Sequence, residues 1–215
     1  MLIVALTGGI ATGKSVVAAI LKERGCFIHS ADRIAHNLIK PGRPAWRAAV
    51  AHFGQGILNP DQSIDRAKLG KIVFSDPKAR KFLNGLIHPF VLRKKKETIR
   101  RLEREDRYRI FVSEAALTIE SGFAPFFDRI IAVDCPKRVQ VRRLMERDGI
   151  TRPEALKKIA SQMPSAQKIK FADYIIDTSG TLAETAGQTA RVYRALLADF
   201  RKKQKEGKSA AAIKR

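Results

Sequence analysis

One eight-residue segment, 8–15, constrains the fold of this chain more than any other. It reads Gly-Gly-Ile-Ala-Thr-Gly-Lys-Ser and matches G-x-x-x-x-G-K-[ST], a phosphate-binding loop. Such a loop works between a strand and a helix, because the helix N-terminus then points backbone N–H groups and a positive dipole at the same phosphates. An apolar run at 2–6 predicts a buried strand, and helical spacing over 14–24 predicts a helix that stops at Gly25. The predicted strand before this segment and the predicted helix after it argue against a chance glycine turn.

Further short apolar runs predict the other strands. Helical segments separate these runs, which lie at 26–28, 109–112, 130–133 and 174–176. Strands that alternate with helices are typical of an α/β fold, so we expect a three-layer P-loop fold around a parallel sheet. The interval 33–108 is too long for one crossover helix and predicts an inserted helical subdomain. Residues 137–170 predict a second helical insertion.

The chain is strongly basic. Among 215 residues it has 42 Lys and Arg against 21 Asp and Glu, a formal net charge of +21. Such a surface attracts polyanions, which leaves nucleic acid, an anionic membrane or a phosphate-rich small molecule as natural ligands. Residues 93–109 and 201–215 carry 11 of the excess charges. Acidic residues interleaved in the first segment indicate a solvated helix more than a continuous nucleic-acid-binding surface. The second segment predicts a frayed basic tail.

Composition excludes several other classes of protein. With 45% hydrophobic residues the chain can build a core, so disorder throughout is excluded. No run approaches the roughly 18 apolar residues of a membrane-spanning helix, and the first residues lack a signal-peptide pattern, so we expect a cytoplasmic protein. Cys26 and Cys135 lie far apart and have no companions at metal-ligand spacing, which argues against a disulfide framework or a zinc site.

Several side chains are candidates for chemistry around the loop. Lys14 can reach the β and γ phosphates of a nucleotide, and the Ser15 hydroxyl can bind Mg²⁺. Asp32 and Glu114 each follow a predicted strand, at the sheet edge where α/β proteins bind ligands. Asp32 can orient or deprotonate an attacking hydroxyl, or instead cap a helix that begins at Arg33. Glu114 can act as a second acid near the metal, or be a surface acid at a strand end.

The second insertion carries two arginines on one predicted helix face. Gln140, Arg143 and Arg147 are spaced i, i+3 and i+7, which places them on one side of a helix. They predict a lid that closes over a transferring phosphate, with an ordinary solvated face as the alternative. His88 in the large insertion has no Ser or Cys partner pattern, which argues against nucleophilic catalysis.

An ordered set of motifs resembles the dephospho-CoA kinase family from residue 2 to about 195. The set comprises Leu6 to Ile10, Gly13-Lys14-Ser15, Ala31-Asp32, Pro41-Gly42, Ile64-Asp65-Arg66, Leu69, Val73-Phe74, Ile87-His88-Pro89, Glu120-Ser121-Gly122, Gln140 with Arg143, Arg147-Asp148, Gln162 and Ala172-Asp173. The resemblance implies phosphorylation of the ribose 3′-hydroxyl of dephospho-CoA by ATP, the last step of coenzyme A synthesis. Thr178 stands where Asn is common in the family.

Roles for individual residues follow from the same resemblance. The phosphate site would consist of Gly8, Gly9, Ala11, Thr12, Gly13, Lys14, Ser15 and Val16, and Asp32 would face the acceptor hydroxyl. Dephospho-CoA would meet His88, Pro89, Glu114 and Leu117, with Arg143 and Arg147 in the lid and Mg²⁺ on Ser15. The implied organisation is a nucleotide-binding core of 1–32, 109–136 and 171–200, an acceptor subdomain 33–108, a lid 137–170 and a tail 201–215.

Two alternatives remain at this point. One is another small-molecule P-loop kinase. The other is a basic nucleic-acid-binding protein that uses the loop as a nucleotide switch, although residues 93–109 hold a single aromatic residue and offer little for base stacking. The preferred interpretation has ATP and dephospho-CoA as its ligands, no membrane or nucleic-acid partner, and a monomeric state.

Overall fold

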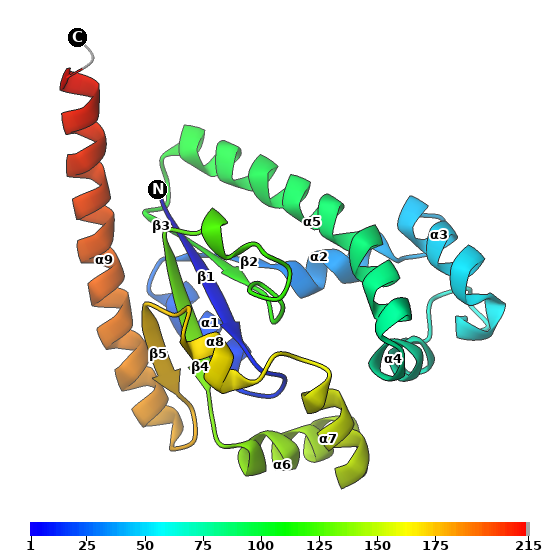
Figure 1. Cartoon of the computed structure of the whole chain (residues 1–215). Helices are drawn as coiled ribbons and strands as arrows, with labels where there is room; N and C mark the ends of the chain where they lie inside the picture. Colours follow the sequence, from blue (N-terminus) through cyan, green and yellow to red (C-terminus); the bar gives the residue numbers. More distant parts are fainter. Residues whose placement is uncertain (214–215) are drawn as a thin grey trace. The chain divides into compact units, whose positions relative to one another are not determined.

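A parallel sheet forms the centre of the protein. The computed structural model describes residues 1–213, and the side chains of Asp32 and of residues 207–213 lie outside that description. The strands are β1 (Leu2–Gly8), β2 (Phe27–Ser30), β3 (Ile110–Glu114), β4 (Arg129–Asp134) and β5 (Tyr174–Asp177). Their order across the sheet is β2-β3-β1-β4-β5, with β1 in the middle (Figure 1). The predicted α/β fold with a parallel sheet is confirmed, because β1 pairs in parallel with β3 and β4, and β4 with β5.

Helices fill the intervals between the strands. They are α1 (Lys14–Glu23), α2 (Ala31–Leu38), α3 (Pro44–Phe53), α4 (Arg66–Ser75), α5 (Pro77–Glu105), α6 (Lys137–Asp148), α7 (Arg152–Ala160), α8 (Ser165–Ile169) and α9 (Leu182–Ile213), with short 3₁₀ turns η1 (Gln55–Ile57) and η2 (Ala124–Phe126). Figure 1 shows α1 behind the sheet and α8 in front of it. The predicted frayed tail is wrong over residues 201–213, since α9 continues to Ile213.

The chain divides into two compact units. Residues Ser30–Arg100 form one, and Met1–His29 with Arg101–Arg215 form the other. The sheet, α1 and the helices from α6 onward belong to the second of these, which we call the sheet unit. The segment Ser30–Arg100, which we call the helical unit, holds α2 to α4 and most of α5.

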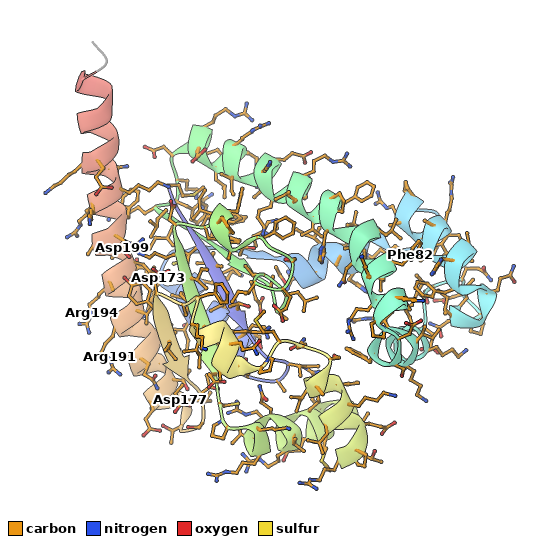
Figure 2. The ribbon with its side chains drawn as sticks, viewed as in Figure 1. Phe82, Asp173, Asp177, Arg191, Arg194 and Asp199 are labelled. Atoms are coloured by element: carbon orange, nitrogen blue, oxygen red, sulfur yellow. The ribbon has the colours of Figure 1, made fainter. Side chains whose placement is uncertain are left out.

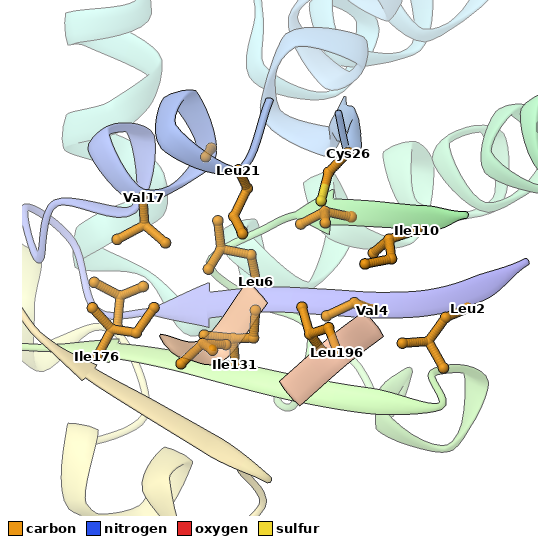
Figure 3. Packing of buried hydrophobic residues seen from close by; sticks show 14 residues of the cluster. Leu2, Val4, Leu6, Val17, Leu21, Cys26, Ile110, Ile131, Ile176 and Leu196 are labelled. Atoms are coloured by element: carbon orange, nitrogen blue, oxygen red, sulfur yellow. The ribbon is translucent and has the colours of Figure 1, made fainter. Parts of the chain in front are cut away.

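The core of the sheet unit consists mainly of aliphatic side chains from β1, β3, β4, β5, α1 and α9 (Figure 3). Leu6 on β1, Leu21 on α1 and Leu196 on α9 are all fully buried. Burial on this scale stabilises the fold by about 1.5–3 kcal/mol for each large aliphatic side chain. The strand β1 is apolar throughout because both of its faces are covered, which is the expected pattern for the middle strand of a parallel sheet. The phosphate-binding loop therefore follows a strand that is buried between its two neighbours.

A charged cluster fastens α9 to the sheet. Arg129 at the start of β4 donates two hydrogen bonds to Asp199 on α9, from Nε at 2.8 Å and from Nη2 at 3.0 Å. The Tyr174 hydroxyl on β5 donates to the same carboxylate at 2.7 Å. Figure 2 labels Asp199 on the inner side of α9, with Arg191 and Arg194 on the same helix. Partial burial raises the pKa of Asp199, but these hydrogen bonds, together with the charges of Arg129 and Lys202, lower it overall.

The helical unit has its own small core. Ala49, Ile57, Ile64 and Leu69 are buried together, and Trp46 packs against them. The Asp65 side chain starts α4 by accepting hydrogen bonds from the backbone N–H groups of Ala67 and Lys68. The His52 ring on α3 stacks on Phe82 of α5, with 3.6 Å between ring centroids.

Candidate functional site

The phosphate-binding loop leaves β1 through a glycine that no other residue can replace without a backbone shift. A Cβ atom added to Gly8 would lie 2.3 Å from the Val133 carbonyl oxygen of the neighbouring strand. The Thr12 hydroxyl would lie 2.8 Å from the same Cβ atom. Gly8 also has a φ of +153°, which side-chain-bearing residues rarely adopt. The loop is thus pressed against β4 as it leaves the sheet.

The loop ends at an open helix N-terminus. Gly13 has a φ of +87° and supplies no side chain to cap α1, so the first turn of α1 keeps its positive end for a ligand. The Lys14 ammonium group folds back over the loop and donates to the carbonyl oxygens of Gly8, at 3.1 Å, and Gly9, at 2.8 Å. Gly9 also accepts a hydrogen bond from the Thr12 hydroxyl at 3.0 Å. This arrangement can bind a phosphate chain at the helix end.

A cavity of about 360 Å³ opens beside the loop. Its lining joins the loop, helix α6 and the start of α9, and consists of Ala11, Gly13, Ser15, Val16, Arg143, Arg147, Thr178, Gly180, Leu182 and Thr185. The structure therefore brings both predicted lid arginines to the same cavity as four of the predicted phosphate-site residues. A cavity of this size falls in the range that small-molecule ligands occupy.

Thr178 connects three parts of this cavity. Its hydroxyl donates to the Thr12 carbonyl oxygen at 2.6 Å, and the residue is buried. Arg143 donates to the Thr178 hydroxyl at 3.1 Å and to the Thr178 carbonyl oxygen at 2.6 Å. The phosphate loop, the end of β5 and α6 are therefore joined through one hydroxyl group. The sequence singled out Thr178 only as a departure from the family pattern, because its contacts join residues far apart in the chain.

The two arginines differ in their surroundings. Arg143 is half-buried and held by Thr178, whereas the Arg147 side chain is 58% exposed and binds the Asp148 carboxylate with Nε at 2.7 Å. Lys158 on α7 donates to the same carboxylate at 2.9 Å. The hydrogen bond from Arg147 is the main cause that lowers the pKa of Asp148, to about 2; burial raises it and Lys158 lowers it again. On α6, Gln140 is buried, which differs from a wholly solvated face.

Helices α6 and α7 and the residues that follow them also contact the phosphate-binding loop. Ile10 and Ala11 of the loop pack against the small apolar core of α6 and α7, which contains Val141, Leu144 and Ala155. The Gln162 side chain, just after α7, accepts a hydrogen bond from the Ile10 N–H group at 2.8 Å. Sequence reasoning gave Gln162 no role, since only the folded structure brings it to the loop.

A buried lysine holds the loop that follows β3. Lys168 on α8 is 1% exposed, and its ammonium group donates to the Ala116 carbonyl oxygen at 2.6 Å. It also pairs with the Glu120 carboxylate at 2.7 Å. A buried charge needs such partners, because an uncompensated one is strongly destabilising. This ion pair was another feature that the sequence pattern missed.

Two predicted acceptor-site residues lie at this end of the sheet unit. Glu114 is the last residue of β3, and its Cα pairs in register with that of Leu6, two positions before Gly8. Leu117 lies in the following loop, where its carbonyl oxygen accepts a hydrogen bond from the Ser121 hydroxyl at 2.6 Å. Both therefore lie at the carboxyl end of the strands, as expected for ligand-binding residues in this fold.

The other predicted acceptor-site residues belong to the helical unit. Asp32 lies in the first turn of α2, which begins at Ala31 and is capped by the Ser30 side chain through Arg33 N–H at 3.4 Å. The alternative in which Asp32 caps a helix starting at Arg33 is therefore wrong.

His88 and Pro89 lie in the middle of α5. Burial lowers the pKa of His88, and the charge of Lys95 lowers it further. Lys95 is itself buried, and burial lowers its pKa to about 8. A buried cation next to a half-buried imidazole suits contact with an anionic group.

The described part of the chain offers neither a metal cluster nor a membrane-spanning helix. Among the side chains that the structure describes, no group of three or more His, Cys, Asp or Glu is arranged to hold a metal ion. No helix among those that the structure describes has the length and apolar content needed to cross a membrane.

Comparisons with known proteins agree with one another. The family model for dephospho-CoA kinase matches residues 2–184. The dephospho-CoA kinase of Geobacter metallireducens is 43% identical over 194 residues, which cover 90% of this chain and 96% of that protein. That of Syntrophus aciditrophicus is 39% identical over 212 residues, covering 99% and 89%.

Solved structures give the same picture. The dephospho-CoA kinase from Campylobacter jejuni superposes with a TM-score of 0.63 at 29% identity, over 89% of this chain and 95% of that one. A crystal structure from Thermus thermophilus superposes with a TM-score of 0.74 at 30% identity, over 92% and 97%.

Proposed function

The chain belongs to the dephospho-CoA kinase family, and on that premise we propose which of its residues carry out the reaction. The protein is a kinase that uses ATP to phosphorylate dephospho-CoA, the step that completes coenzyme A. The observation that carries the residue assignment is the single cavity shared by the phosphate loop and the lid arginines. Catalysis in this reaction class depends mainly on positioning and charge stabilisation.

On the donor side, the phosphate loop binds the ATP phosphates. The residues we assign to this contact are Gly8, Gly9, Ala11, Thr12, Gly13, Lys14, Ser15 and Val16. Lys14 leaves the carbonyl oxygens of Gly8 and Gly9 and neutralises the β and γ phosphates. The adjoining cavity, with Thr178 at its wall, takes the rest of the nucleotide.

We assign Mg²⁺ to the Ser15 side chain. Ser15 is exposed, lines the cavity and offers the hard oxygen donor that Mg²⁺ prefers, with phosphate oxygens completing the ligand set. When bound, the ion neutralises phosphate charge. The chain's own contribution is to place that hydroxyl at the start of α1.

On the acceptor side, Asp32 takes the proton from the ribose 3′-hydroxyl. The hydroxyl oxygen forms a bond to the γ-phosphorus atom of ATP, the bond from that phosphorus to the β–γ bridging oxygen breaks, and ADP leaves. His88, Pro89, Glu114 and Leu117 bind the rest of dephospho-CoA. Lys95, buried beside His88, supplies positive charge in the same unit for an acceptor that carries a pyrophosphate.

Arg143 and Arg147 stabilise the charge of the transferring group. Arg147 is the arginine that can be redirected more easily, because it is 58% exposed and binds the carboxylate of the adjacent Asp148. Exchange of that carboxylate for a phosphate would cost little, since exposed ion pairs contribute about 0–1 kcal/mol. We further propose that the enzyme acts as a monomer in the cytoplasm, which light scattering after gel filtration and cell fractionation would test.

The assay is direct. Purified protein is incubated with Mg²⁺, ATP and dephospho-CoA, and coenzyme A is followed by mass spectrometry. A Lys14→Met variant serves as the control for a contaminating kinase, because it keeps the side-chain length and removes the charge. Formation of coenzyme A by the wild type alone supports the assignment. Turnover of a nucleoside monophosphate or another small alcohol, with none of dephospho-CoA, would assign the chain to another P-loop kinase activity.

A further inference from the structure

The peptide group between Gly9 and Ile10 is held at both of its ends. Its carbonyl oxygen accepts hydrogen bonds from Lys14 Nζ at 2.8 Å and from the Thr12 hydroxyl at 3.0 Å. Its N–H group donates to Gln162 Oε1 at 2.8 Å. Because a trans peptide is planar and its C=O and N–H groups point in opposite directions, fixing one end fixes the other. The side chain of Gln162 thus sets the direction of a carbonyl group that binds Lys14.

The segment that carries Gln162 is held by an ion pair between Glu120 and the buried Lys168 of α8. The backbone N–H group of Met163, the next residue, donates to Glu120 Oε1 at 3.2 Å. Lys168 pairs with that same oxygen at 2.7 Å and also binds the Ala116 carbonyl oxygen. Lys168 is 1% exposed, so its ammonium group depends on these two oxygen acceptors to compensate for its burial. The segment after α7 is therefore fixed against the loop that follows β3.

We propose that Gln162 is a positioning residue for phosphoryl transfer: it orients the Gly9–Ile10 peptide, and through it Lys14, while the Lys168–Glu120 pair holds Gln162 in place. The inference rests on the proposed function for its kinetic readout. Gln162, Glu120 and Lys168 are not among the residues assigned above to ATP or to the acceptor. If this peptide can rotate, the Gly9 carbonyl oxygen moves. The Lys14 ammonium group that it binds is then displaced from the position from which it reaches the phosphates.

The first experiment compares two variants at Gln162 with one control variant at Gln167. Gln162→Met has a similar length but no acceptor, and Gln162→Glu keeps an oxygen at the end of the side chain. Gln167→Met, on the exposed side of α8, is the matched control. We expect Gln162→Met to lower kcat/KM for ATP about tenfold, the effect of one lost hydrogen bond, with KM for dephospho-CoA changed by less than about twofold. Gln162→Glu should bind the Ile10 N–H group, and Gln167→Met should match the wild type.

A second readout does not need turnover. Hydrogen exchange of the Ile10 amide, followed by NMR, should be about tenfold faster in Gln162→Met than in the wild type, and restored in Gln162→Glu. ATP affinity measured by calorimetry should weaken in the same variant. These measurements test the inference even if dephospho-CoA proves not to be the acceptor. Unchanged Ile10 exchange and unchanged ATP kinetics in Gln162→Met would overturn it.

The role of the ion pair is tested by a double-mutant cycle. Glu120→Gln keeps an acceptor for Met163 but removes the charge that Lys168 needs. If this pair acts through Gln162, the loss of kcat/KM for ATP in the double variant Glu120→Gln/Gln162→Met should be no larger than in Gln162→Met alone. If the loss in the double variant equalled the product of the two single losses, the pair and Gln162 would act separately. That result would overturn this part of the proposal. An equal rise of KM for both substrates in Gln162→Met would indicate a general structural defect, which also overturns it.

Discussion

Arg143 donates two hydrogen bonds to Thr178, one to the hydroxyl group and one to the backbone carbonyl oxygen, at 3.1 and 2.6 Å. The hydroxyl then donates to the carbonyl oxygen of Thr12 in the phosphate loop. An arginine on α6 and the loop 8–15 are therefore connected through one residue of the cavity wall. This relationship makes Thr178 a sensitive position for the nucleotide site.

Replacement of Thr178 by Val should weaken ATP binding. The variant keeps the shape of the side chain but leaves the Thr12 carbonyl oxygen and Arg143 without their hydroxyl partner. We expect KM for ATP to rise about tenfold and the free energy of unfolding to fall by about 1–2 kcal/mol. Steady-state kinetics and urea denaturation measure the two effects. Thr178→Ser, which retains the hydroxyl group, should stay close to the wild type, and an equal loss in both variants would contradict the explanation.

Replacement of Asp32 by Asn should lower turnover and spare ATP affinity. The amide cannot accept the proton of the ribose hydroxyl, so we expect kcat to fall by about 10²–10⁴-fold. ATP affinity, measured by calorimetry, should change by less than about twofold because the phosphate loop is intact. Glu97→Gln, an exposed change on α5, is the control. Normal turnover in Asp32→Asn would remove the proposed role.

The contribution of the Asp148 carboxylate to the free energy of unfolding should depend on pH. Its pKa is lowered to about 2, mainly by the hydrogen bond from Arg147. A lowered pKa means that the carboxylate stabilises the folded state above its unfolded pKa of about 3.9, and that this contribution disappears as the pH falls to about 2. The difference in free energy of unfolding between the wild type and Asp148→Asn should therefore be constant from pH 7 to 5 and shrink towards pH 2. If the difference in free energy of unfolding grew on acidification, the pKa of Asp148 would have to be raised in the folded state, contrary to the prediction.

Replacement of Asp199 by Asn should destabilise the sheet unit without affecting chemistry. The variant loses the charge that Arg129 binds through two hydrogen bonds, and we expect a loss of about 1–3 kcal/mol in the free energy of unfolding. Values of kcat should stay within about twofold at 25 °C. Glu206→Gln tests an exposed i,i+4 pair on the same helix and should cost about 0.5 kcal/mol or less. Similar losses in the two variants would argue against a special role for the Arg129–Asp199 contact.

Deletion of residues 201–215 should leave the kinase active. The deletion removes the Lys203 contacts with Asp128, at 2.6 Å, and with the Met1 carbonyl oxygen, at 3.2 Å. Since this is a partly exposed pair, the free energy of unfolding should fall by about 1 kcal/mol at most. A protein that instead bound nucleic acid through these charges would lose affinity on truncation, and its binding would weaken steeply with salt. Gel-shift titrations at two salt concentrations distinguish the two.

Local patterns predicted much of the fold. The apolar runs at 2–6, 109–112, 130–133 and 174–176 correspond to strands, and the helix expected at 14–24 is α1. Apolar periodicity is local, so it can be recognised without knowledge of the partners. The order of the strands was not predicted, because it depends on pairings between distant residues. The end of α9 was also mispredicted, since a high density of cations at the end of the chain is compatible with both an exposed helix and a frayed segment.

The sequence likewise predicted one part of the site and missed another. The sequence identified the phosphate loop and the lid arginines, because both have fixed local spacing, and the structure brings them to one cavity. It missed the roles of Thr178, Gln162 and Lys168. Each of these side chains acts on a backbone group at least 52 positions away, so no local spacing identifies them. Their contribution is to fix loop geometry, which a motif describes only by its glycines.

The central position of β1 has a consequence for how the protein is made. Leu2 pairs with Ile110 and Val4 with Arg129, so both neighbours of the first strand are synthesised more than a hundred residues after it. During synthesis, this apolar strand has no sheet to join until β3 and β4 follow. The phosphate-binding loop at its end therefore acquires its working shape only after segments about a hundred or more residues further along the chain have been made.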